Sequence, residues 1–138
     1  LANISACPDL LFADCKVSNN FARGVLIKTK RAEVCGCTFE NTHSATVRVS
    51  AEESWGEGIS AEDVRIHDNV FINCARQVGP ASAVAAFTDS KTGEGEQIGS
   101  VRVYNNTVIG SGDVPDFYLK NVREPRIDDN VSAYAAKK

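Results

Sequence analysis

A short acidic segment carries the residues best suited to acid–base chemistry. The stretch AEESWGEGISAED, residues 51–63, sets Glu52, Glu53 and Glu57 around Trp55, the only tryptophan of the chain. Carboxyl groups act as general acids or bases, and glycoside hydrolysis uses two of them at a defined separation. The broad apolar face of tryptophan suits stacking on a sugar ring. These residues are candidates for a carbohydrate site, and an idle surface loop is the alternative.

Two further polar features can also be interpreted either as part of a carbohydrate site or as ordinary solvent-exposed surface. The segment DSKTGEGEQIGS, residues 89–100, is a second acidic insert and is expected to be a solvent loop. Arg65, Arg102 and Arg126 occupy equivalent places in a repeated pattern described below. A row of three arginines could bind an acidic sugar, but a solvated face neutralised by a neighbouring column of aspartates is the favoured interpretation.

The spacing of cysteine and histidine predicts no metal site. The chain has five cysteines, and Cys35-Gly-Cys37 is not a CxxC motif. No pair of Cys or His residues lies at zinc spacing, and the odd cysteine count argues against a closed disulfide framework. We expect buried free thiols, with a single disulfide as the alternative. His43 and His67 are interpreted as surface residues.

A repeated pattern must position these side chains. The template apolar-x-apolar-x-x-(Asn or Cys)-x-apolar occurs four times, with a weaker fifth copy. Its polar anchors are Cys15, Cys37, Asn69, Asn106 and Asn130. The basic period is therefore 22–24 residues, and two copies are lengthened by the acidic inserts. A second strand is predicted in each repeat, over 24–29, 45–50, 82–88 and 116–121.

A period of this length made only of short strands is typical of a solenoid. We predict an all-β fold, a right-handed parallel β-helix of pectin-lyase-like type with about five coils, formed by residues 1–138 as one domain. Equivalent residues would lie about 4.8 Å apart in neighbouring coils. The anchor asparagines are expected in the left-handed conformation at a corner, with their amides hydrogen-bonded from coil to coil. The two acidic inserts should emerge side by side.

Composition narrows the range of partners. The net charge is −3, from 18 acidic and 15 basic residues, which does not predict a nucleic-acid surface. No apolar run approaches the length of a membrane span, and no signal peptide is visible. Neither end resembles a solenoid cap. We therefore expect the C-terminal part of a longer protein, whose open end is covered by a preceding β-helix domain or by a second copy in a homodimer.

Residues 15–74 resemble a known family. The phrase NNFARGVLIKT, residues 19–29, and the tryptophan loop ahead of the next asparagine turn are similar to the late coils of glycoside hydrolase family 110, which are bacterial α-1,3-galactosidases. A weaker match continues through FYLKNVREPRIDDN, residues 117–130. A complete enzyme of that family is several times longer, so catalytic carboxylates could lie outside this chain.

The resemblance implies specific roles. The enzyme would be an inverting hydrolase without a cofactor, in which one carboxylic acid protonates the leaving oxygen and one carboxylate activates water. Glu57 first, then Glu52 or Glu53, would be catalytic or would bind sugar hydroxyls. Arg23 and Trp55 would bind the substrate.

Three functions remain open on the sequence. The first is a carbohydrate-active β-helix acting on an oligo- or polysaccharide, which implies an extracellular or periplasmic location. The second is a non-catalytic binding or structural module of a surface or tailspike-type protein. The third is a polysaccharide lyase or epimerase, although no convincing calcium-binding cluster of aspartates is present in the sequence. Fold alone does not separate these functions.

Overall fold

Three parallel sheets build the protein. The computed structural model describes residues 7–52, 60–76, 82–88, 97–110 and 114–134. Sheet A contains β1 (Leu10–Ala13), β4 (Arg31–Cys35), β7 (Asp63–His67), β10 (Ile98–Tyr104) and β13 (Val122–Asp128). Sheet B contains β2 (Lys16–Ser18), β5 (Thr38–Glu40), β8 (Val70–Ile72), β11 (Thr107–Gly110) and β14 (Val131–Tyr134). Sheet C contains β3 (Val25–Ile27), β6 (Val47–Val49), β9 (Val84–Ala86) and β12 (Phe117–Leu119).

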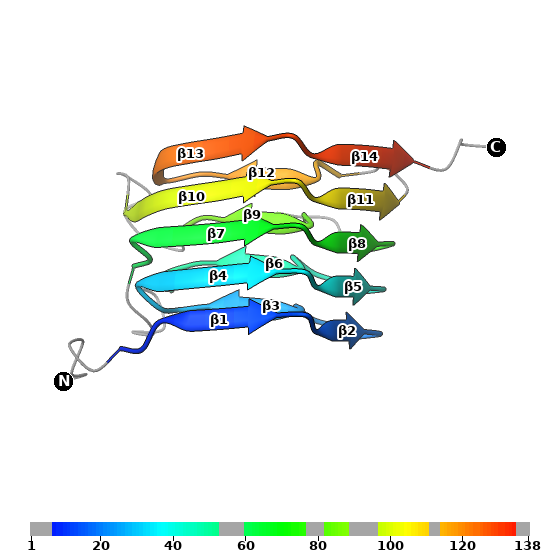
Figure 1. The fold of residues 1–138 in the computed structure, drawn as a ribbon, viewed down its shortest axis with the longest axis horizontal. Coiled ribbons are helices and arrows are strands. Elements are labelled where there is room, and N and C mark those ends of the chain that lie inside the picture. The colour runs from blue at the N-terminus through cyan, green and yellow to red at the C-terminus, as the bar shows by residue number, and fades with distance from the viewer. Residues whose placement is uncertain (1–6, 53–59, 77–81, 89–96, 111–113, 135–138) are drawn as a thin grey trace.

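Successive strands of the chain belong to sheets A, B and C in turn, and each such turn forms one coil of the stack. Each of the first four coils gives a strand to sheet A, then sheet B, then sheet C, and the described part of the fifth coil adds β13 and β14. The coils stack from the N-terminal to the C-terminal end (Figure 1). Every strand pairing in the described residues is parallel. None of these residues forms a helix, so none forms one that could cross a membrane. The arrangement fits a parallel β-helix.

The strand register confirms the repeat alignment. Val34 pairs with Ile66, and Ile66 pairs with Val103, as the shared template position requires. Phe39 likewise pairs with Phe71. The prediction of two strands for each coil was incomplete, because the residues that follow each anchor form a separate strand in sheet B. All four strands predicted after the anchors are present, in sheet C.

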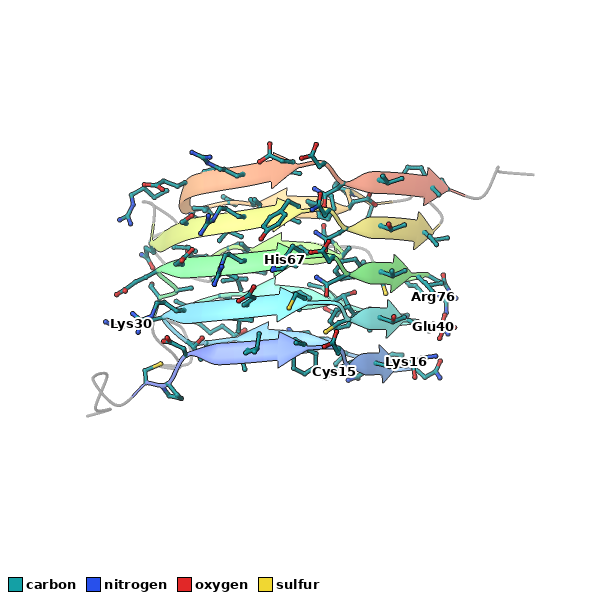
Figure 2. The ribbon with its side chains drawn as sticks, viewed as in Figure 1. Cys15, Lys16, Lys30, Glu40, His67 and Arg76 are labelled. Carbon is teal, nitrogen blue, oxygen red and sulfur yellow. The ribbon has the colours of Figure 1, made fainter. Side chains whose placement is uncertain are left out.

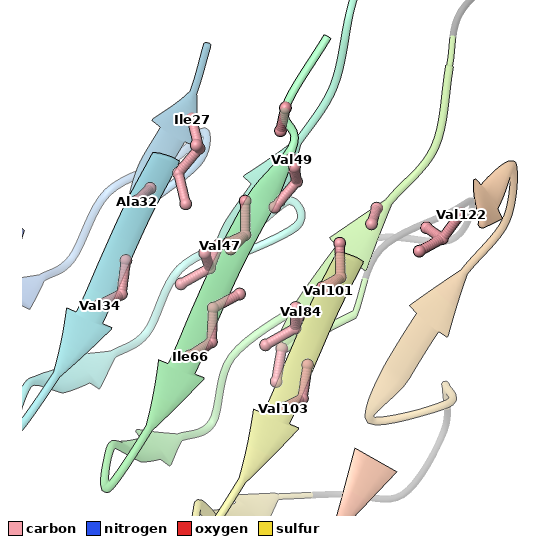
Figure 3. Packing of buried hydrophobic residues seen from close by; sticks show 14 of the residues in the cluster. Ile27, Ala32, Val34, Val47, Val49, Ile66, Val84, Val101, Val103 and Val122 are labelled. Atoms are coloured by element: carbon pink, nitrogen blue, oxygen red, sulfur yellow. The ribbon is translucent and has the colours of Figure 1, made fainter. Parts of the chain in front are cut away.

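Apolar side chains from the three sheets fill the interior of the stack. Valine and isoleucine dominate it, and Val34, Val47 and Ile66 are fully buried (Figure 3). Phe39 and Phe71 stack face to face, with ring centroids 5.2 Å apart. Because strand side chains alternate between the two faces, the residues between these positions point outward and remain available for a surface site.

The corner between sheets A and B differs from the prediction in one respect. The left-handed residue is the one before each anchor, not the anchor itself. These residues are Asp14, Gly36, Asp68, Asn105 and Asp129, with φ between 53° and 63°. Aspartate, asparagine and glycine adopt this conformation at lower cost than other residues.

The predicted asparagine ladder is confirmed at this corner. Asn69 Nδ2 donates to Asn106 Oδ1 at 3.0 Å, and Asn106 Nδ2 donates to Asn130 Oδ1 at 2.9 Å. Cys37 continues the column, and its backbone N–H donates to Asn69 Oδ1 at 3.0 Å. The Cys37 thiol donates to the backbone oxygen of Phe12 at 3.4 Å. All five cysteines are free thiols, but only Cys37 is buried, whereas the sequence analysis favoured buried thiols throughout.

The two ends of the stack expose apolar side chains. Leu11 is 67% exposed on β1, and Val131 is 61% exposed on β14. Each outermost strand also has one edge without a paired strand among the described residues. Such edges are suited to pairing with a further coil or a second chain.

Candidate functional site

The two acidic inserts begin and end side by side on neighbouring coils. Where they leave sheet C, the Phe87 N–H donates to the Val49 backbone oxygen at 3.1 Å. Where they return to sheet A, the Gly99 N–H donates to the Ala61 backbone oxygen at 2.9 Å. The predicted adjacency is therefore confirmed for the bases of the inserts.

All three predicted catalytic residues, and the predicted sugar-stacking tryptophan, belong to the first insert. Glu53, Trp55 and Glu57 lie outside the described residues, so their roles stay predictions. Glu52 and Arg23 are described, and the structure brings them into one cluster of charges.

Glu52 lies at the base of the first insert and is surrounded by three cations. Its Oε2 accepts from Lys28 Nζ at 2.8 Å. Its Oε1 lies 3.2 Å from Arg48 Nη2 and 4.0 Å from Arg23 Nη2. The Glu52 side chain is 12% exposed. The Arg48 guanidinium also lies over the Phe87 ring, 4.3 Å from its centroid, so the cluster joins the bases of both inserts.

These contacts determine the charge state of Glu52. The hydrogen bond from Lys28 lowers the pKa of Glu52, and the charges of Arg48, Lys28 and Arg23 outweigh the opposing effect of burial. Glu52 is consequently ionised at neutral pH. A carboxylate held in this way is well suited to positioning cations and sugar hydroxyl groups and poorly suited to donating a proton.

Arg23 sits in a turn whose shape has local structural causes. Asn20 closes the turn, because its Nδ2 donates to the Arg23 backbone oxygen at 2.9 Å and its Oδ1 accepts from the Ala22 N–H at 3.0 Å. Gly24 follows, and a Cβ there would lie 2.9 Å from the Thr46 backbone oxygen. Asn20 and Gly24 of this phrase therefore have structural roles, in closing the turn and in the close approach of the next coil. The Arg23 Nε is buried and has no hydrogen-bond partner among the described residues.

The outer face of sheet A carries the predicted column of arginines. Arg65 and Arg102 are neighbours in register, and Arg102 is opposite Arg126. Arg65 pairs with Glu33 and Arg102 pairs with Asp63, each at 3.1 Å and partly exposed. The neutralising acids thus come from neighbouring strand positions rather than from the aspartate column expected from the sequence.

His67 lies on the same outer face, as a surface interpretation requires, but it is partly buried and has specific partners (Figure 2). Its Nε2 is 2.8 Å from Glu33 Oε1, and its Nδ1 is 2.6 Å from Asp68 Oδ2. Its ring stacks on Tyr104, with centroids 4.7 Å apart. Burial lowers the pKa of His67, but the hydrogen bonds to Asp68 and Glu33 outweigh it and the pKa is raised.

Three potential metal ligands meet beside this histidine. Glu33, Cys35 and His67 each present one ligand atom, and these atoms lie within 4.8 Å of one another. Cys35 pairs with His67 across β4 and β7, and Glu33 is two residues before Cys35 on the same face. Sequence spacing missed this group because its members belong to different coils. Cys35 and His67 each lie two residues before an aligned anchor, Cys37 and Asn69, so the repeat alignment implies one shared column and could have revealed the group.

An exposed aromatic platform lies on the turns beside sheet B. Phe21 is 83% exposed, and its ring stacks on His43 with centroids 4.6 Å apart. Asn19, Asn41 and Arg76 line the same shallow hollow. An apolar ring edged by amides and a guanidinium can contact both the face and the hydroxyl groups of a sugar.

The chain is similar to α-1,3-galactosidase A from two strains of Bacteroides fragilis. One protein is 30% identical over 124 residues, which cover 86% of this chain and 20% of that relative. The second is 29% identical over the same length and the same shares. The chain thus spans about a fifth of the length of the curated relatives it matches. No protein-family model and no solved structure matches it. The similarity supports a glycoside hydrolase-like, carbohydrate-active relationship.

Proposed function

We propose that the chain is a right-handed parallel β-helix of pectin-lyase-like type that belongs to an α-galactosidase-like glycoside hydrolase. The observation that carries this proposal is the similarity to α-1,3-galactosidase A, which extends over 86% of the chain. The stacked parallel coils support it, because an aligned repeat preserves the place of each outward residue. The substrate would be an oligo- or polysaccharide, and the protein would act outside the cell or in the periplasm.

The acidic inserts would supply the chemistry in this proposal. Glu57 and Glu53 are the candidate acid and base, and Trp55 would stack on the sugar. Glu52, at the base of the first insert, would support the site by holding Arg23, Lys28 and Arg48 in place, since it contacts all three. The position of Arg48 over Phe87 would keep the two inserts together.

Hydrolysis by the 138-residue chain tests this directly. The chain would be incubated with aryl α-galactosides and with an α-1,3-linked galactose disaccharide, and compared with Glu57→Gln and Glu53→Gln. Glu62→Gln is the matched control, because Glu62 is an exposed carboxylate that pairs with Lys30 at 3.1 Å. Loss of general acid or base catalysis should lower kcat by about 10²- to 10⁴-fold, whereas Glu62→Gln should keep full activity.

A non-catalytic carbohydrate-binding module is the second candidate. The exposed Phe21 platform favours it, because it offers a surface suited to a sugar ring on the turns beside sheet B. Binding without turnover, weakened by Phe21→Ala but not by Glu57→Gln, would support this function over hydrolysis. Neither turnover nor binding of any galactoside by the folded chain would refute both candidates.

The exposed apolar ends suggest a neighbour for the stack. We propose that a preceding β-helix domain, or a second copy in a homodimer, covers the end bearing Leu11. Sedimentation of the chain and of Leu11→Lys would distinguish these two, because only a homodimer formed through this end would dissociate on substitution.

A further inference from the structure

The outer face of sheet A holds a group of donors that the hydrolase proposal does not use. Glu33 and Cys35 project from β4 and His67 projects from β7, and they provide one oxygen, one sulfur and one nitrogen. From this convergence we propose that Glu33, Cys35 and His67 bind a divalent cation of the zinc type.

Each of the two polar ligands already has a partner that orients it. Asp68 Oδ2 holds His67 Nδ1 at 2.6 Å, which leaves Nε2 facing Glu33 Oε1 at 2.8 Å. Arg65 Nη2 holds Glu33 Oε2 at 3.1 Å and leaves Oε1 for the ion. A carboxylate on the outer nitrogen of a ligating histidine is the usual support for zinc, because it orients the ring and increases its basicity.

The surroundings favour a cation and leave an open side. Asp14 and Asp68 lie close enough to Cys35 to act on it electrostatically, as does Glu33. Tyr104 covers one side of the His67 ring. On the side of Cys35 away from β7, strand β1 places Ala13 opposite Cys35. The side chain of Ala13 is a single methyl group, so β1 covers little of the site there.

The donor set selects the metal. Thiolate and imidazole ligands favour zinc over magnesium or calcium, which prefer oxygen. Ligand atoms about 2.0–2.3 Å from one zinc ion lie roughly 3.3–3.7 Å apart in a tetrahedral site. The 2.8 Å separation of His67 Nε2 and Glu33 Oε1 must therefore widen, and the other separations already lie within 4.8 Å. Three protein ligands leave a fourth position for water or another small ligand.

Cobalt(II) titration of the chelator-treated, reduced 138-residue chain tests the site. The absorption spectrum of bound cobalt reports its coordination number and whether sulfur is a ligand. Displacement of the cobalt by zinc then measures the affinity of the site for zinc. The ligand variants are Cys35→Ser and His67→Gln. Asp68→Asn is the conservative variant of the supporting residue, and asparagine tolerates the left-handed backbone at that position. Cys74→Ser and His43→Gln are matched controls on a thiol and an imidazole elsewhere.

We expect one cobalt ion per chain, with thiolate-to-cobalt charge transfer. This signal should disappear in Cys35→Ser, and tight binding should be lost in His67→Gln. Asp68→Asn should weaken binding by about 10- to 100-fold, and both controls should bind normally. Thermal unfolding without metal shows that each variant is folded. Absence of a thiolate signal in the parent chain, or unchanged binding by folded His67→Gln, would overturn the proposal.

Discussion

Replacing Asn106 by alanine should destabilise the protein far more than changing its neighbour Asn105. Asn106 is 1% exposed. Its Oδ1 accepts from the Asn69 N–H at 3.1 Å and from Asn69 Nδ2 at 3.0 Å. Its Nδ2 donates to Asn130 Oδ1 at 2.9 Å and to the Ile66 backbone oxygen at 3.0 Å. Alanine removes all of these bonds.

The expected loss follows from this geometry. Leaving one buried N–H without a partner costs about 1–3 kcal/mol, and each further lost bond costs about 0.5–1.5 kcal/mol. The total for the four bonds is about 5 kcal/mol, a large part of the roughly 5–15 kcal/mol by which domains are stable. The midpoint of thermal unfolding should fall by about 10–20 °C.

Urea unfolding followed by far-ultraviolet circular dichroism measures this loss. Asn105→Gly is the matched control, because Asn105 is exposed with φ of 53° and glycine adopts that backbone conformation readily. We expect a change below about 1 kcal/mol for Asn105→Gly. An equally small change for Asn106→Ala would refute the view that the ladder stabilises the corner.

Three further predictions concern close packing, charge and the core. Gly99→Ala should cost about 1–3 kcal/mol, because a Cβ there would lie 2.3 Å from a backbone oxygen of the preceding coil; in the same urea assay Gly110→Ala, which would meet nothing within 4 Å, should not destabilise. The pKa of Glu52 is lowered on folding, so the stability that its ionised form contributes is complete above its unfolded pKa and is lost as the pH falls through its folded pKa. Glu52→Gln should therefore lower the free energy of unfolding at pH 7 by about 2 kcal/mol. It should also make stability depend less on pH on the acid side of the profile. Phe71→Ala, at a fully buried ring, should cost about 3–5 kcal/mol, whereas Phe21→Ala at an exposed ring should change the unfolding midpoint little.

Sequence reasoning located the coils because the apolar template repeats with its anchors. It placed Asn69 and Asn106 in one column, and the ladder confirms this. It assigned the left-handed conformation to the wrong residue, since both Asp68 and Asn69 are types that favour turns and only the backbone distinguishes them.

The charged sites were less accessible from the sequence. The ligand group of Glu33, Cys35 and His67 joins two coils across an insert, so linear spacing hides it. The cations around Glu52 are likewise spread from Arg23 to Arg48 and meet only after the coils stack. Glu53, Trp55 and Glu57 remain predictions from the pattern alone.

Because the two inserts are hydrogen-bonded to each other at their bases, the length of an insert can change without changing the geometry of the coils. Backbone bonds hold the inserts where they leave Val49 and where they return at Ala61, and they do so between neighbouring coils. Lengthening a flexible segment between fixed ends adds only about 0.6 kcal/mol for each doubling. A new recognition sequence could therefore be grafted after Glu52 and before Ala61, which keeps the ion pairs of Glu52 and the backbone bonds at both bases. This edge is the natural place to engineer a different specificity.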